Sequence, residues 1–185
     1  MSKILVDTID TRSGTSTLTL GSSNLTTLNK ASGVTANFGK IGQVIYASTT
    51  TQSQSTSTSY ATTGFTASIT PSATSSKILV MANIHYQIFG TGVDTDFGGN
   101  FKIVRTVSST DTDVFIEANP TPRTYNTHSG NAYEFESYNM TELDEPSTTS
   151  ACTYTIHSKA RNTSNRISLS QDSAISTFTL MEVLA

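Results

Sequence analysis

The sequence predicts an all-β protein, and three features point that way. Serine and threonine make up 61 of the 185 residues, which favours β-branched strands and polar turns over helices. Charged residues are only 14% of the chain, and no stretch carries apolar residues at the 3.6-residue spacing of a helix. Several stretches instead alternate apolar and polar residues, as half-buried strands do. We therefore expect a β-sandwich of about eight strands, of the jelly-roll type or a related Greek-key type.

Residues 1–40 carry a strand pattern but too little apolar mass to fold alone. Leu18 and Leu20 alternate with Thr17 and Thr19, whereas most other residues of this segment are Ser, Thr, Asn, Asp or Gly. Ordering each residue costs about 1–2 kcal/mol of backbone entropy, so the segment is either disordered or completed by other copies of itself. Its strand period favours the second interpretation. We expect residues 1–40 to form an extended, β-rich docking and oligomerisation arm, intertwined in a homotrimer, and residues 41–185 to form the sandwich.

The first half of the sandwich contains the most apolar run of the chain. Alternation predicts strands at residues 43–46 and 65–69, the second ended by Pro71, with the polar tract 49–63 as an edge strand or loop between them. Residues 77–89 are apolar on both faces. They predict a central strand covered on both sides, either within a sandwich or with help from a partner subunit.

Two glycine-rich or proline-rich connections interrupt the second half, at residues 90–100 and 118–131. The alternation of residues 133–140 switches parity, which suggests a bulge near Ser137. Apolar side chains persist from Phe178 almost to the last residue, so we expect this segment to be held in the core or at a subunit interface. The remaining strands are expected at residues 101–105, 114–116, 133–140, 152–159, 166–170 and 177–184.

Charge and apolar patterning exclude several classes of function. The formal net charge of −3 and the scattered Lys and Arg argue against a nucleic-acid binder. No apolar run has the length of a signal peptide or a membrane-spanning helix, so we expect a soluble protein made in a cytoplasm, without membrane insertion. Cys152 is the only cysteine, which excludes an intrachain disulfide.

The sequence lacks the groupings that catalysis requires. It has no G-x-S-x-G motif, and we expect His85 and His157 to be structural and His128 to be a solvated residue or a binding contact. Paired carboxylates of a glycan-degrading enzyme cannot be identified. We predict that the protein is not an enzyme and has no cofactor.

Metal binding is also not expected. A trimer could place one His from each chain around its axis, but no His-x-His pair favours this arrangement. Asp94 with Asp96, and Asp111 with Asp113, have a spacing that suits calcium loops, yet neither loop has a full ligand set. We expect hydrated turn carboxylates at these four positions.

The two long connections carry the mixture of aromatic rings, amides and carboxylates that binds sugars. We predict that they contact a host glycan or protein, although ordinary polar loops, or packing of Arg123 and Tyr125 against a neighbouring subunit, explain the same residues. The predicted contacts are Asp94, Asp96, Phe97, Asn100, Arg123, Tyr125, Asn126 and His128, with Asn119 and Asn131 beside them.

Four stretches resemble tail-fibre-like structural proteins of marine bacteriophages, cyanophages among them. They are SKILVDTIDTRSGTSTLTLGSSN (2–24), ITPSATSSKILVMANI (69–84), DEPSTTSACTYTI (144–156) and STFTLMEV (176–183). The resemblance implies a virion appendage, usually trimeric, with a short N-terminal attachment segment and a C-terminal β-sandwich. No long shaft follows the arm, which suggests a short fibre used for adhesion to the host. The alternative is a capsid decoration protein, of the cement or head-fibre kind, that clamps neighbouring shell subunits.

Overall fold

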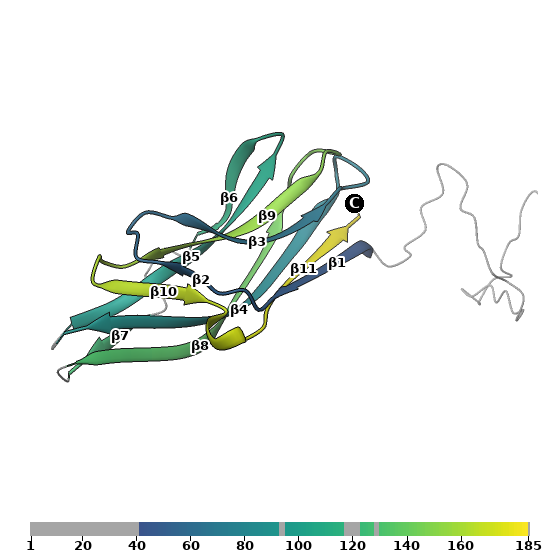
Figure 1. Ribbon diagram of the computed structural model, residues 1–185. Coiled ribbons are helices and arrows are strands. Elements are labelled where there is room, and N and C mark those ends of the chain that lie inside the picture. Colours follow the sequence, from purple (N-terminus) through teal and green to yellow (C-terminus); the bar gives the residue numbers. More distant parts are fainter. Residues whose placement is uncertain (1–40, 93–94, 117–122, 128–129, 185) are drawn as a thin grey trace, which may run out of the picture. The chain divides into compact units, whose positions relative to one another are not determined.

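The computed structural model describes residues 41–92, 95–116, 123–127 and 130–184. Within these residues the chain forms two antiparallel sheets and one short 3-10 turn, η1 (Gln171–Ser173) (Figure 1). Sheet A contains β1 (Ile41–Thr49), β2 (Ser53–Ser55), β4 (Lys77–Thr91), β8 (Asn131–Asp144), β10 (Asn165–Leu169) and β11 (Ser176–Val183). Sheet B contains β3 (Ala61–Ile69), β5 (Thr95–Val107), β6 (Thr110–Ile116), β7 (Arg123–Asn126) and β9 (Cys152–Ala160).

Each sheet is four strands wide, because several short strands share one row. Along one edge of the long strand β4, β11 and then β10 pair in succession, and β8 pairs along the other edge. On the other side of this row, β1 pairs with β11 and β2 pairs with β10, so that β1 and β2 together form the edge row of sheet A. In sheet B, β9 separates β3 from β5, and β6 and β7 share the far edge of β5.

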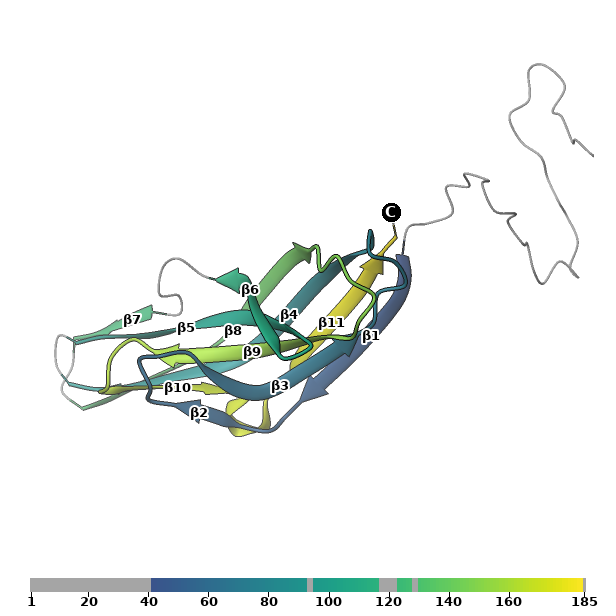
Figure 2. The same cartoon turned by 90° about the horizontal axis from the view of Figure 1, so that it is seen from above.

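The order of these rows is that of a jelly roll. Numbered along the chain, the rows of sheet A run first, eighth, third, sixth, and those of sheet B run second, seventh, fourth, fifth. Two interleaved Greek keys produce this order, and the two layers face each other in Figure 2. The prediction of an all-β sandwich of the jelly-roll type is therefore confirmed.

The core lies between the sheets and is built by alternate residues of each strand. Phe65 of β3 contacts Phe178 of β11 with ring centroids 5.5 Å apart, and Tyr86 of β4 contacts Phe101 of β5 at 5.9 Å. Both pairs join one sheet to the other. Strand β4 is central to sheet A, as its apolar run predicts, because β10 and β11 pair with one of its edges and β8 with the other. Its inward residues Ile78, Val80, Ala82 and Ile84 are buried.

A polar group also joins the two sheets. Nη1 of Arg105 in β5 donates to both carboxylate oxygens of Asp144 in β8, at 2.5 and 2.6 Å. The hydroxyl of Tyr154 in β9 donates to the same carboxylate at 2.7 Å. Burial and this carboxylate raise the pKa of Tyr154 well above its ordinary value, so the hydroxyl stays a donor.

Glu182 fixes the β3–β4 loop to the first strand. Its buried carboxylate accepts hydrogen bonds from the backbone N–H and hydroxyl of Ser72, both at 2.6 Å, and from Nε2 of Gln43 at 3.0 Å. Burial alone would raise the pKa of this carboxyl group, but the hydrogen bonds from Ser72 and Gln43 outweigh it and lower the pKa to about 2.

Three sequence expectations differ from the structure. The expected loop 90–100 is mostly strand, because β4 continues to Thr91 and β5 starts at Thr95. The irregular stretch 118–131 contains β7, whereas the polar tract 49–63 contains β2 at the edge of sheet A, in agreement with the edge strand expected there. No bulge occurs at Ser137, since β8 pairs with β4 in one unbroken register. Its parity switch arises because β8 carries apolar side chains first on its outer face and then on its inner face.

The expected arm, residues 1–40, lies outside the described residues, so its strand content and trimeric assembly stay predictions. None of the helical structure in the described part of the chain has the length and apolar character needed to span a membrane.

Candidate functional site

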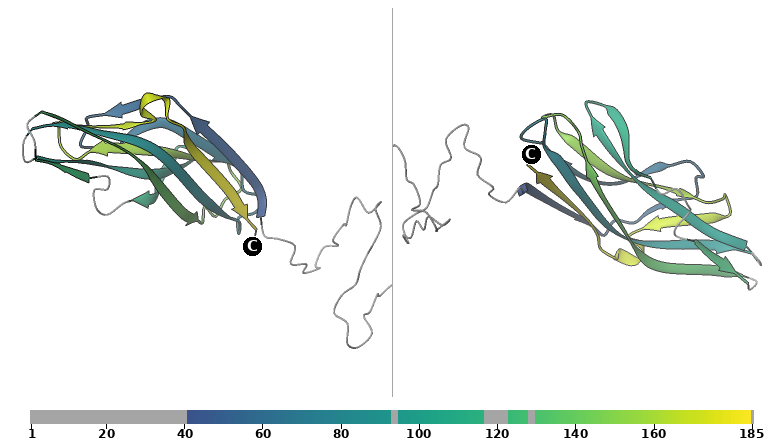
Figure 3. Two further views of the ribbon diagram at one scale, coloured as in Figure 1. Left: turned by 90° about the horizontal axis from the view of Figure 1, so that it is seen from below. Right: turned by 180° about the vertical axis from the view of Figure 1, so that it is seen from behind.

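The predicted contact residues that the structure describes lie toward one end of the sandwich, which we call the far end. Here β4 ends at Thr91, β8 begins at Asn131, and β9 ends at Ala160. The opposite end, the near end, holds Ile41, which pairs with Val183. Figure 3 shows both ends, with the C-terminal label at the near end beside the start of β1.

An ion-pair cluster forms at the far end on the paired strands β5 and β7. Asp96 accepts hydrogen bonds from Nε and Nη2 of Arg123, at 2.7 and 2.5 Å, and lies 2.9 Å from Nη2 of Arg161. The hydrogen bonds from Arg123 lower the pKa of Asp96, with the charge of Arg161 adding to the effect. Arg123 is more than half exposed, so it remains accessible to an anionic group while it holds Asp96.

Tyr125 and Asn126 accompany this cluster. Tyr125 is opposite Asp96 in the β5–β7 register and is 58% exposed. The side chain of Asn126 donates to the backbone oxygen of Gly92 at 2.8 Å, which holds β7 against the end of β4. The structure thus brings together four predicted residues: Asp96, Arg123, Tyr125 and Asn126.

Phe97 and Asn100 do not belong to this surface. Phe97 is only 1% exposed, and its ring lies over the backbone of Gly90, where an added Cβ would come within 1.9 Å of the ring. Asn100 is also buried. Their prediction as loop contacts was wrong in placement, because residues 95–107 form a strand whose inner side faces the core. Asp94 and His128 lie outside the described residues, and contact with a receptor stays a prediction for the exposed members.

A second group of side chains at the far end was missed by the sequence analysis. On the outer face of sheet A, the rings of Phe89 and Tyr133 lie 5.0 Å apart, and the guanidinium of Arg166 lies 4.7 Å from the Phe89 ring centroid. Phe135 follows on β8, and both Tyr133 and Phe135 are more than half exposed. If the alternation of residues 133–140 is continued without a bulge at Ser137, the sequence places Tyr133 and Phe135 together on one face of the strand, and the structure shows this to be the outer face.

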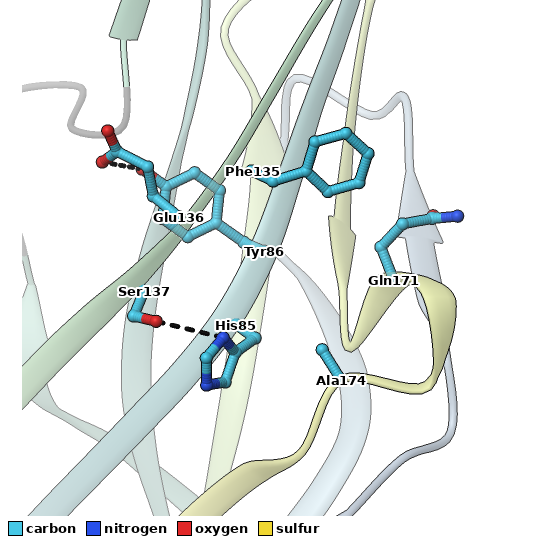
Figure 4. A pocket seen from close by; sticks show the side chains of 7 residues that line it. All are labelled: His85, Tyr86, Phe135, Glu136, Ser137, Gln171 and Ala174. Carbon is cyan, nitrogen blue, oxygen red and sulfur yellow. Dashed lines mark hydrogen bonds between the residues drawn. The ribbon is translucent and has the colours of Figure 1, made fainter.

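A shallow pocket of about 190 Å³ adjoins Phe135 (Figure 4). Ser137 and Nδ1 of His85 form a hydrogen bond of 3.0 Å along its wall. One side is the η1 turn, where Ser170, Asp172 and Ser173 all have left-handed backbone angles. The lining residues are His85, Tyr86, Phe135, Glu136, Ser137, Gln171 and Ala174. An aromatic face with polar groups at its rim suits weak binding of a sugar or a peptide side chain.

The inner face of β8 carries two acidic residues at the far end, Glu134 and Glu136. Burial raises the pKa of Glu134, with a hydrogen bond from Thr124 opposing it and the charge of Glu136 adding to it. Glu136 instead accepts a hydrogen bond from the Tyr86 hydroxyl at 3.1 Å. Glu134 is therefore half-buried rather than freely solvated.

No group of metal ligands emerges among the described residues. His157 lies beside Lys102 in sheet B, and its pKa is lowered by burial and by that charge. Cys152 is buried, which raises the pKa of its thiol. In the part of the chain that the structure describes, no three His, Cys, Asp or Glu side chains gather closely enough to hold a metal ion.

Comparisons with known proteins were made by sequence and by structure. A scan of the sequence against protein-family models gives no match, and a search of curated proteins gives none. Among solved structures, infectious bursal disease virus of the Gx strain is similar at 15% identity, with 86% of this chain and 41% of the viral chain covered and a TM-score of 0.34.

Two further structures of the same virus give comparable values. The VP2 subviral particle is 13% identical, with 86% and 42% of the two chains covered and a TM-score of 0.33. For the T13 viral particle the identity is 13%, the coverage 86% and 40%, and the TM-score 0.34. The chain thus spans less than half the length of these viral chains. Its jelly roll is established by its own strand pairing.

Proposed function

We propose that the protein is a non-enzymatic structural component of a virion, with a jelly-roll head that contacts the host surface. In this proposal residues 1–40 attach the head to the particle and join copies of the chain into a homotrimer. The resulting assembly is a short tail fibre of a phage that infects marine bacteria. The four stretches that resemble such proteins support this assignment; the stretch 69–84 covers the β3–β4 loop and the first half of β4, and the stretch 176–183 is β11.

The observation that carries the proposal is the separation of the two ends of the sandwich. The chain enters at Ile41, at the near end, whereas the exposed side chains of Arg123 and Tyr125 lie at the far end. A head tethered through residues 1–40 can therefore present the far end outward. Jelly rolls occur in both viral capsid proteins and lectins, and either use agrees with this arrangement.

Adhesion through several copies would not need a deep pocket on any one of them. Once one head has bound, a second on the same rigid body meets the surface at an effective concentration that reaches the millimolar range for short linkers. Each copy offers one shallow site, built from Tyr125, Arg123 and the Phe135 pocket. Three copies on one rigid body can thus give firm attachment.

Binding of the labelled full-length protein to marine cyanobacterial cells tests adhesion. We expect Tyr125→Ala combined with Arg123→Ala to reduce bound protein at least tenfold. The matched control is Ile116→Ala, because Ile116 is 55% exposed but pairs with Lys102 near the middle of β5, away from the far end. Equal binding by both variants would contradict the assigned surface. Release of reducing ends from host polysaccharide would contradict the non-enzymatic role.

Capsid decoration is the second candidate, and the jelly-roll topology favours it because viral capsid proteins share this fold. Gold-labelled antibody against the head, viewed on whole particles, distinguishes the two. Label at the tail supports the short fibre, and label over the capsid surface supports decoration.

A further inference from the structure

The outer face of sheet A carries an apolar surface at the near end. Three cross-strand rows build it, each running over β1, β11 and β4, and two of them continue onto β8. The middle row is apolar throughout: Val44, Met181, Leu79 and Leu143. We call the whole group the apolar patch, and its members are Ile41, Val44, Tyr46, Leu79, Met81, Leu143, Met181 and Val183.

The patch is open in the isolated sandwich. Val44 is 53% exposed and Tyr46 is 64% exposed, and Ile41 and Leu143 are nearly half exposed. The charged residue beside it, Lys77, lies in the outermost row and pairs with Glu145 at 2.5 Å. The other members of the middle and Tyr46 rows are apolar residues or threonines. Contiguous uncharged surfaces of this kind mark interaction sites.

Its size argues for a partner that is also held elsewhere. Four strands about 4.8 Å apart and three alternate residues along each give a footprint of roughly 400 Å². A stable interface buries about 800 Å² on each partner. The patch alone would therefore support only weak association, and a second point of attachment is needed.

We propose that the apolar patch packs against a second copy of this chain, as part of the interface that holds the oligomer together. This inference deepens the oligomeric part of the proposed function. The 40 residues expected to join several copies connect directly to Ile41, which is itself a member of the patch. Copies joined through that segment meet with their patches close together and at high effective concentration. Identical uncharged faces also meet without repulsion.

The far half of the same face supplies a matched control. Tyr133 and Phe135 are 54% and 55% exposed, which is close to the values for Val44 and Tyr46. Their neighbours are both aromatic and polar, since Phe89 lies opposite Tyr133, Gln87 lies opposite Phe135, and Arg166 of β10 lies opposite Phe89. The two pairs of residues thus differ in position and surroundings while they share exposure and sheet.

Tryptophan fluorescence of the full-length chain tests which surface is covered, because the natural sequence has no Trp. In Y46W the indole emission should be shifted to the blue at micromolar concentration and move to the red on dilution. In Y133W it should stay that of an exposed indole at every concentration. Blue emission of Y46W in a monomer would mean that the chain's own arm covers the patch, and would overturn the proposal.

Light scattering of two charged double variants completes the test. V44E with Y46E should raise the apparent dissociation constant of the oligomer at least tenfold, whereas Y133E with F135E should leave the mass unchanged. An unchanged mass for the first variant, or a monomeric wild type, would overturn the proposal. Because neither readout involves a receptor, a failure of cell adhesion alone would count against the proposed function and leave this interface intact.

Discussion

At the scale of single residues, buried polar groups rather than apolar ones fix the connections between elements. Glu182 ties the β3–β4 loop and β1 to the end of β11, and Asp144 ties β8 to the opposite sheet through Arg105. Each carboxylate has several donors, which offsets the cost of burying its charge. Neither role is visible in the sequence, because Glu182 lies more than 30 residues from Gln43 and Asp144 lies more than 30 residues from Arg105.

Glu182→Gln should make stability less dependent on pH. The pKa of Glu182 is about 2 in the folded chain and near 4.5 ordinarily, so its contribution is complete above pH 4.5 and is lost as the pH falls toward 2. The variant loses about 2 kcal/mol at neutral pH, since its amide nitrogen would face the Nε2 donor of Gln43.

Urea unfolding at pH 7 and pH 3 measures this effect. The gap in unfolding free energy between wild type and Glu182→Gln should narrow at pH 3. Glu142→Gln, at an exposed position of β8, should match the wild type at both pH values. A gap of constant size would show that Glu182 acts through packing instead of charge.

Gly90→Ala should destabilise the far end by about 1–3 kcal/mol, as overpacking of a core does. The new methyl group would overlap the ring of Phe97, which is buried. Thermal unfolding measures the loss. Adding Phe97→Leu should recover part of it, and a double variant less stable than the sum of the two single changes would argue against this contact.

At the scale of elements, the density of apolar residues predicted well where a strand lies in its sheet. Turn-forming residues predicted poorly where strands begin and end. Residues 77–89 form the centre of sheet A as expected, and residues 65–69 alternate as expected. Glycines at 98 and 99 suggested a loop, yet they lie within β5, where a Cβ on Gly99 would meet Ile167 at 2.4 Å. Glycine is needed there for close packing of the sheets and not for a turn.

Deletion of the chain from Phe178 onward should abolish folding and assembly. Strand β11 lies between β1 and β4, and its inward residues Phe178 and Leu180 are fully buried. Losing two such side chains costs about 5–10 kcal/mol, which is comparable to the whole stability of a domain. Circular dichroism and light scattering measure the outcome. Leu180→Ala is the milder companion, expected to lower stability without loss of fold, and a native-sized oligomer of the truncated chain would refute the assigned role of β11.

At the scale of the whole molecule, the sequence was sufficient for the fold and insufficient for the site. The composition and the alternation of apolar and polar residues led to the prediction of a jelly roll, because both depend on local residue patterns. The grouping of Asp96, Arg123 and Arg161 depends on strand ends brought together from distant parts of the chain. The aromatic group of Phe89, Tyr133 and Phe135 depends on the register of β4 with β8, which a single sequence does not reveal.

The pairing of β1 with β11 has a mechanical consequence. If the chain is anchored before Ile41 and pulled at the far end, the tension runs along β1, parallel to the strand. The backbone hydrogen bonds from β1 to β11 lie perpendicular to that direction, so they are sheared together rather than broken one at a time. The pairing of β1 with β11 thus resists a pull applied along the sandwich better than a pull that peels β1 away from its edge.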